Sequence, residues 1–153
     1  AERNLLLHDG ISTFTVGSDG LVALERAITT YQTNAYDIED PSFLDVTTPK
    51  TLAYIRFVLR AELARTYPRF KIADDGTRVS PGAAITTPGA IKGTAISVFR
   101  RLEDRGIVEQ VDAWKSGVYA ERHPDDPTRV NLLVPPDIVN PLHLIAVKMD
   151  WVL

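Results

Sequence analysis

The sequence predicts an α+β domain in which a small mixed or antiparallel β-sheet packs with two main amphipathic helices. Two segments repeat apolar residues at intervals of three and four, as helices with one buried face do. Around them, short runs rich in Val, Ile and Leu are separated by Gly, Pro and Asp, as strands and turns are. The 153 residues contain no internal repeat and no low-complexity segment, so we expect a single domain over residues 1–153.

The first third of the chain predicts a β-hairpin. Strand-like stretches at residues 5–7 and 12–16 precede the tetrad GSDG at 17–20, and a second apolar stretch follows at 21–28. Gly and Asp between two such stretches favour a hairpin turn. The polar segment 29–43 then predicts an irregular connection.

The first main helix is predicted to begin at Thr47-Thr48-Pro49, where a hydroxyl can cap the helix and proline fits the first turn. It should end near Tyr67, because Pro68 disfavours helical geometry in the residue before it. Residues 69–87, rich in Asp, Gly and Pro, predict a long loop of the kind that usually has a functional or interfacial role. The buried stripe of the first main helix is predicted at Leu52, Ile55, Val58, Leu59 and Leu63.

The second main helix repeats the same start signal at Thr86-Thr87-Pro88, and Gly106 is predicted to close it as a left-handed cap. Its buried stripe is predicted at Ile91, Ala95, Val98, Phe99 and Leu102. A basic exposed side is predicted at Lys92, Arg100, Arg101 and Arg105. Such a side is either a solvated helix face or a contact surface.

The remaining strands are predicted at residues 107–111, 118–122 and 129–134. The double proline at 135–136 should end this run, because proline cannot extend a ladder of backbone hydrogen bonds.

Residues 142–153 predict a last, long strand with no turn sequence after it. From Ile145 on, apolar side chains alternate with others in the period of a half-buried strand. A strand with no partner in its own fold offers free N–H and C=O groups to a neighbouring molecule. The end of the chain therefore suggests intersubunit pairing more than chemistry.

Charge and hydropathy argue against nucleic acid and membranes as partners. The chain has 17 Lys and Arg against 20 Asp and Glu, a net charge of −3, whereas polyanion binding usually needs a basic excess. No apolar run approaches the roughly 20 residues of a membrane helix. The sequence begins with Ala rather than Met, and we expect it to be part of a longer protein.

No catalytic, cofactor or metal site is predicted. The chain has no cysteine, which excludes thiol chemistry and fits assembly in a reducing cytoplasm. His8, His123 and His143 have no partner at ligand spacing. Asp37, Glu39, Asp40 and Asp45 could form a calcium loop, and Asp74 and Asp75, before Gly76, could form a carboxylate pair for acid–base chemistry. A simple turn is the preferred interpretation of both groups.

Long motifs resemble the C-terminal region of contractile phage tail sheath proteins of the Mu-like family. They are ERAITTYQTN at 25–34, DPSFLDVTTPKTLAYIRFVLRAEL at 40–63, YPRFKIADDGTR at 67–78, FRRLEDRGIVE at 99–109 and the whole segment 121–153. The resemblance covers nearly the whole chain and includes the finish on an apolar strand.

The resemblance implies a structural role in a virion tail, built in the host cytoplasm. Sheath subunits form a helical stack of rings around a tail tube and contract to drive the tube into the target cell. The C-terminal domain forms the inner layer of this lattice, and its partners are other sheath copies, the tube protein and the baseplate.

In such a lattice, the terminal arm, here residues 142–153, adds a strand to a neighbouring subunit's sheet, and an N-terminal arm from another subunit joins the same sheet. The resemblance thus assigns the intersubunit strand to Leu144, Ile145, Val147, Met149, Trp151 and Leu153. For contact with the tube, the charge pattern points to Lys92, Arg100, Arg101 and Arg105.

Two other functions stay open at the level of sequence. One is a baseplate or other tail assembly protein that shares this domain. The other is a small hydrolase using Asp74, Asp75 or His123, which would require these side chains to converge in a pocket.

Overall fold

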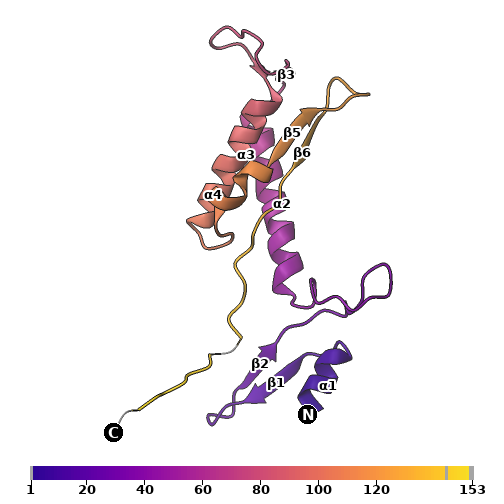
Figure 1. Ribbon diagram of the computed structural model, residues 1–153, viewed down its shortest axis with the longest axis vertical. Coiled ribbons are helices and arrows are strands. Elements are labelled where there is room, and N and C mark those ends of the chain that lie inside the picture. Colours follow the sequence, from indigo (N-terminus) through magenta and orange to yellow (C-terminus); the bar gives the residue numbers. More distant parts are fainter. Residues whose placement is uncertain (1, 144, 152–153) are drawn as a thin grey trace.

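The computed structural model describes residues 2–143 and 145–151 and confirms the α+β class (Figure 1). The molecule is elongated along its longest helix, α2. The helices are α1 (Glu2–His8), α2 (Thr47–Thr66), α3 (Pro88–Glu103), α4 (Val111–Trp114) and the 3-10 turn η1 (Lys115–Gly117). The strands are β1 (Thr13–Val16), β2 (Val22–Arg26), β3 (Lys71–Ile72), β4 (Ile85–Thr86), β5 (Tyr119–Arg122) and β6 (Val130–Leu133).

The strands of the described chain form three separate two-stranded ladders rather than one sheet. β1 pairs with β2 and β5 pairs with β6, both antiparallel, whereas the short β3 and β4 run parallel. Since β3 and β4 lie in the predicted loop 69–87, that loop is tied together at its two ends.

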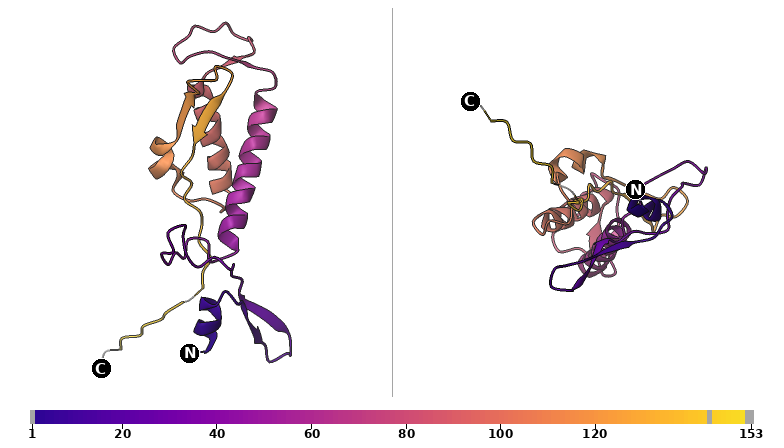
Figure 2. Two further views of the ribbon diagram at one scale, coloured as in Figure 1. Left: turned by 90° about the vertical axis from the view of Figure 1, so that its right-hand side faces the viewer. Right: turned by 90° about the horizontal axis from the view of Figure 1, so that it is seen from below.

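Residues 47–139, called here the body, contain the main apolar core. α2 and α3 lie side by side, and β5 and β6 pack across α3 (Figures 1 and 2). The ring of Phe99 is fully buried and meets Trp114 edge-on, with ring centroids 5.0 Å apart. The core cluster consists of Ile55, Leu59, Ala95, Val98, Phe99, Leu102, Val108 and Val111. These residues include members of both predicted helical stripes, which confirms the buried faces of the two helices.

Residues 2–46, called here the foot, lie at the N-terminal end of α2 (Figure 1). The predicted hairpin is confirmed: the Gly17 N–H donates to Leu21 O at 2.9 Å, and Gly20 has a φ of 78°. The strand predicted at residues 5–7 is wrong, because this segment belongs to α1. A short apolar run does not by itself separate strand from helix, and Gly10, with a φ of 75°, ends the helix here.

The two main helices begin differently although their start sequences match. Thr87 caps α3 as predicted, since its side chain accepts a hydrogen bond from the Ala90 N–H and Pro88 fills the first turn. α2 instead has Val46 at its N-cap, with no side-chain hydrogen bond there. The predicted hydroxyl cap of α2 is therefore wrong. The helix begins at Thr47, so Thr47 and Thr48 lie within its first turn and neither is at the N-cap position before Pro49. Gly106, with a φ of 66°, closes α3 as predicted.

The strand predicted at residues 107–111 is also wrong. Val108 makes only an isolated bridge with Ile138, and Val111 begins α4. Gln110 has a φ of 53°, which ends the extended geometry, and Val111 then places Trp114 one helical turn further on. The apolar residues of this segment thus fill the core from a short helix.

Over the described residues, no helix combines the length and the apolar character needed to span a bilayer.

Candidate intersubunit surfaces

The terminal arm was defined above as residues 142–153. Its described residues, 142–143 and 145–151, extend away from the body (Figures 1 and 2). Over residues 145–151 the backbone makes no hydrogen bond to another described segment. The side chains of Leu142, Ile145, Val147, Met149 and Trp151 are between 72% and 87% exposed. Leu144 and Leu153, also predicted to pair, lie outside the described residues. The described part of the arm thus carries a row of exposed apolar side chains beside unpaired backbone groups.

The β5–β6 hairpin has one face on the body and two outer edges. Leu132 packs against the core cluster, while Tyr119 and Leu133, which are paired across the strands, are 56% and 64% exposed. In the described chain no third strand pairs with β5 or β6. An edge of this kind can accept an added strand, because its N–H and C=O groups face outward.

The β1–β2 hairpin of the foot exposes an apolar face. Phe14 stands opposite Leu24 and Val16 opposite Val22, and these four side chains are between 61% and 68% exposed. An isolated two-stranded hairpin is marginally stable, and a contiguous apolar patch usually marks an interaction surface. Because apolar residues occur on both faces of residues 21–28, the sequence predicts that both faces are partly covered. This prediction is wrong for β2, in which only Arg26 is partly buried.

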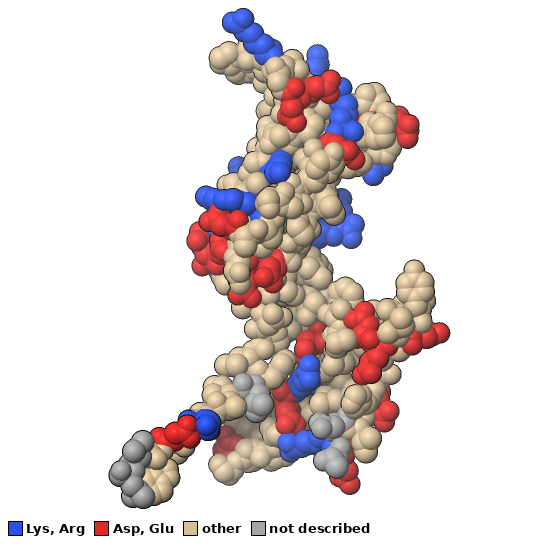
Figure 3. Space-filling model, viewed as in Figure 1, with Lys and Arg blue, Asp and Glu red and all other residues tan. Residues whose placement is uncertain are grey.

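The four basic residues predicted for tube contact lie on or just after α3, and three of them contact their own chain. Arg100 pairs with Asp112 at 3.1 Å, Arg101 pairs with Glu62 at 3.0 Å, and the Arg105 guanidinium lies 5.6 Å from the centre of the Tyr54 ring. Figure 3 shows Lys and Arg beside Asp and Glu along this part of the body. Lys92 makes no ion pair with any described residue. Their role at the tube stays a prediction.

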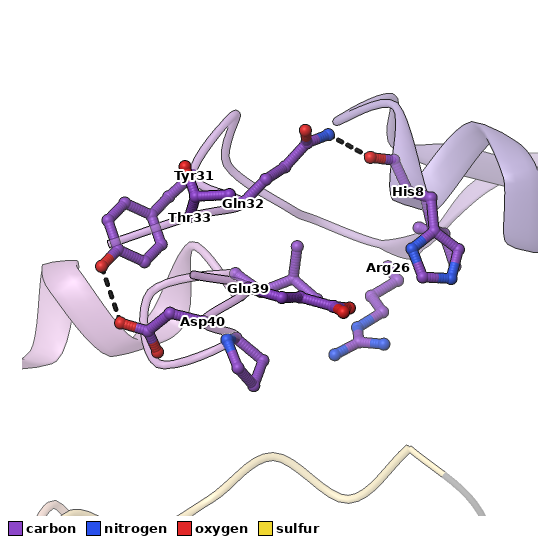
Figure 4. Close-up of a pocket in the computed structure, with 10 residues that line it drawn as sticks. His8, Arg26, Tyr31, Gln32, Thr33, Glu39 and Asp40 are labelled. Atoms are coloured by element: carbon purple, nitrogen blue, oxygen red, sulfur yellow. Dashed lines mark hydrogen bonds between the residues drawn. The ribbon is translucent and has the colours of Figure 1, made fainter. Parts of the chain in front are cut away.

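A hollow of about 630 Å³ lies in the foot, between α1, the end of β2 and the segment 31–41 (Figure 4). The Tyr31 hydroxyl donates to Asp40 at 2.7 Å, and the Gln32 side chain donates to the carbonyl of His8. Hydrogen bonds from Ser42 and then Tyr31 hold the pKa of Asp40 below its ordinary value. The bond from Gln32 ties the loop to α1 and the bond from Tyr31 closes the loop on itself, so the residues around the hollow support local structure.

Of the four acidic residues considered for a calcium loop, Asp40 and Asp45 have protein partners. Arg26 donates to both carboxylate oxygens of Asp45, at 2.8 and 2.9 Å, and His143 lies 3.4 Å from the same carboxylate. Hydrogen bonding to Arg26, and then the charges of Arg26 and His143, hold the pKa of Asp45 below its ordinary value, while burial opposes them. Among residues 2–143 and 145–151, no group of three His, Asp or Glu side chains is arranged to hold a metal ion.

The side chains weighed for a hydrolase each support local structure. Asp75 accepts from the Gly89 N–H at 2.9 Å in the first turn of α3, and Asp74 pairs with Arg122 at 3.2 Å. His123 Nδ1 accepts from the Asp125 N–H at 3.1 Å. A cap, an ion pair and a turn account for these three groups without a reaction.

Sequence reasoning missed an exposed face of α2. Phe57 is 69% exposed and lies with Ala53, Arg56, Arg60, Ala61 and Ala64 around a shallow hollow of about 490 Å³. The helical wheel carried a usable signal, since Phe57 falls outside the buried stripe.

Comparison with known proteins bears on these surfaces. Residues 39–151 match the family described as the phage tail sheath C-terminal domain. The Mu-like prophage FluMu tail sheath protein of Haemophilus influenzae is 39% identical over 152 residues, which cover 99% of this chain and 31% of that relative. The chain thus spans about a third of the length of the curated relative that it matches.

Proposed function

This chain belongs to the phage tail sheath family, and we propose that it is the inner, tube-facing part of a sheath subunit in a contractile tail. In this role, copies of the longer protein polymerise around the tail tube and shorten to drive it into the target cell envelope. The observation that carries the proposal is the arm, whose apolar side chains are exposed and whose backbone groups are unpaired over the described residues 145–151 of a single copy.

The arm of one copy pairs, in this proposal, with an outer edge of β5–β6 on a neighbouring copy. One face of β5–β6 is already fixed against the body, so an added strand would find a defined register and a buried side. The arm offers Ile145, Val147, Met149 and Trp151 on one face for that buried side. The second edge of β5–β6 is then available to an arm from another copy.

A contracting lattice needs joints that hold while the bodies of the subunits rotate. Main-chain hydrogen bonds across an added strand depend on the strand and its acceptor edge and not on the angle between bodies. Pro135-Pro136 ends the pairing of β6 but lies within the body, because Asp137 and Val139 are hydrogen-bonded to Glu109 and Ile107. Between the body and the arm the chain carries Asn140-Pro141, where proline cannot extend a ladder of backbone hydrogen bonds. We place the hinge of the arm there.

Contact with the tube is assigned in this proposal to Lys92, Arg100, Arg101 and Arg105. Their partners Asp112 and Glu62 are on the surface of the same body, so the tube would have to compete with existing ion pairs. Exposed ion pairs contribute little and are screened by salt. The contact is then weak enough to release when the sheath shortens.

No enzymatic step or cofactor is part of this proposal. The free energy for contraction is stored in the contacts of the extended lattice and is released by a trigger at the baseplate. The protein works in the virion tail, after assembly in the host cytoplasm.

The test compares two sets of substitutions in the longer protein that contains this chain. Ile145, Val147, Met149 and Trp151 are changed to Ser in one variant, and Ala146, Lys148 and Asp150 are changed to Ser in the other. We expect the first variant to lose sheaths in electron micrographs and the second to keep them, because only the first removes the face that would be buried. Normal sheaths from the first variant would contradict the proposal.

A further inference from the structure

α2 carries a second surface with no partner in the described chain. Phe57 is 69% exposed at the centre of the hollow of about 490 Å³ described above, between Ala53, Ala61 and Ala64. Small side chains beside an exposed aromatic ring let another molecule approach the helix closely. Arg56 and Arg60 flank the ring, and neither forms an ion pair with any residue that the structure describes.

The loop at residues 34–39 carries acidic side chains where the α2 surface carries basic ones, and it also exposes apolar side chains. It projects from the foot beside the start of α2 (Figure 1). Tyr36 and Ile38 are 83% and 61% exposed, and Asp37 and Glu39 alternate with them. In the described chain neither carboxylate takes part in an ion pair.

Hydrogen bonds hold this loop in one shape. The Asn34 side chain accepts from the N–H groups of Tyr36, at 2.8 Å, and Ile38, at 3.2 Å. The Asn34 N–H donates to Ile38 O at 2.9 Å, and Thr33 and Glu39 form a β-bridge. A loop that is ordered before binding loses less conformational entropy when it docks.

We propose that, in the assembled sheath, the 34–39 loop of one copy docks on the outer face of α2 of the next copy. Tyr36 and Ile38 cover Phe57 and its alanines, and Asp37 and Glu39 face Arg56 and Arg60. This contact rests on the proposed sheath function and deepens it, by naming a second joint between copies.

Two observations favour a second copy as the occupant. The loop and the hollow match in charge and in apolar character, yet no residue of the loop lines the hollow within one chain. Two different patches of one chain that fit each other make a head-to-tail contact, which builds a ring or an open helical stack rather than a two-fold dimer. A sheath is an open stack of this kind.

The first experiment traps the contact by disulfide formation in the longer protein. This chain has no cysteine, and any cysteine in the rest of the longer protein is replaced by serine. Tyr36→Cys is combined with Ala61→Cys in the test variant and with Ala113→Cys in the control, both alanines being exposed. Under mild oxidation of assembled sheaths, we expect a ladder of linked copies only in the test variant. Assembled sheaths without that ladder would overturn the contact and leave the sheath function standing.

The second experiment reverses charges. We expect Arg56→Glu with Arg60→Glu to lower the yield of sheaths about tenfold or more, since like charges would face each other. Adding Asp37→Arg with Glu39→Arg should restore the yield, whereas Arg69→Glu with Arg78→Glu should leave it unchanged. An unchanged yield in the first variant, or no recovery in the combined variant, would overturn the pairing. Failure of the unaltered protein to build any sheath would instead overturn the proposed function.

Discussion

The body and the foot treat the same kind of side chain in opposite ways. Phe99 in the body is 0% exposed, whereas Phe14 in the foot is 61% exposed. The body has a contiguous apolar core, while the foot has only Ile28 and Thr13 among its buried residues over the described chain. The foot is held together by polar contacts, chiefly the Arg26–Asp45 pair and backbone hydrogen bonds from Thr29 to Leu44 and from Val46 to Ala27, which join the end of β2 to the segment that leads into α2.

This difference separates what holds a single copy together from what remains for neighbours. Burial of apolar area is the main stabilising term in a domain, so the body carries most of the stability of the chain. The apolar side chains of the foot and of the arm contribute little in one copy, because water still covers them. Their stabilising effect becomes available only when another surface buries them.

The largest difference between the two regions is expected when an aromatic ring is removed from each of them in turn. Phe99→Ala should lower the free energy of unfolding of the chain by about 3 to 5 kcal/mol, because it opens a cavity in a closed core. Phe14→Ala should change it by less than about 0.5 kcal/mol, because the ring is mostly in water. Urea unfolding followed by circular dichroism measures both. Equal losses would show that the foot has a core of its own.

A smaller effect is expected at the two helix starts. Thr87→Ala should cost about 1 to 2 kcal/mol of stability, since it removes the side-chain cap of α3. Thr48→Ala should cost less than about 0.5 kcal/mol, because no side chain caps α2. The same unfolding titration compares them, and a larger loss at Thr48 would contradict the assigned caps.

That pair of threonines also marks how far sequence reasoning reached. Apolar periodicity predicted both main helices, and Pro68 and Gly106 predicted their ends, because these signals are local. The identical Thr-Thr-Pro starts could not be told apart, since the foot, through Val46 and Asp45, decides where α2 begins. Segments 5–7 and 107–111 were predicted as strands for a related reason: whether a short apolar run pairs depends on a partner strand elsewhere.

The polar tie of the foot should respond to pH. The Arg26 hydrogen bond lowers the pKa of Asp45, so the folded state favours the charged carboxylate more than the unfolded chain does. The contribution of this ion pair to stability is fully present when the pH is above the ordinary Asp pKa of about 4. It is lost as the pH falls through the lower pKa that Asp45 has in the folded state. The protection of the β1–β2 amides from hydrogen exchange, measured relative to an unstructured peptide at the same pH, should therefore fall below about pH 4.

The matched control for the pH response is Asp45→Asn, which cannot form the ion pair at any pH. In this variant the amides of β1–β2 should exchange faster already at neutral pH and should show a weaker acid response. If α3 amides responded to the substitution as strongly as those of β1–β2, the tie would not be specific to the foot.

The smallest effect on a single copy is expected in the arm. Val147→Asp should leave the free energy of unfolding of the chain within about 0.5 kcal/mol, because Val147 is 79% exposed. Val98→Asp is its counterpart in the body, where Val98 is 1% exposed. This variant should fail to fold and should therefore show no cooperative unfolding transition, because a charge would be buried without a partner. Calorimetry of both variants checks this contrast, and a destabilised Val147 variant would show that the arm packs on its own body.

The candidate surfaces were predicted from sequence only in part. The alternation after Ile145 predicted an apolar face for the arm, and the described residues of that face are exposed. The free edges of β5–β6 and the open face of β1–β2 could not be identified in this way, because exposure depends on which elements pack together. The exposure of Phe57 could have been predicted, since it lies outside the buried stripe of its helix, whereas Phe99 lies within one.

The most direct test of the account is the structure of an assembled sheath of the longer protein, determined by electron cryomicroscopy. We predict that residues 145–151 of one copy lie as a strand beside β5 or β6 of an adjacent copy, with Val147 and Trp151 covered. If those residues instead fold back onto their own subunit and leave both β5–β6 edges unpaired, the account is contradicted.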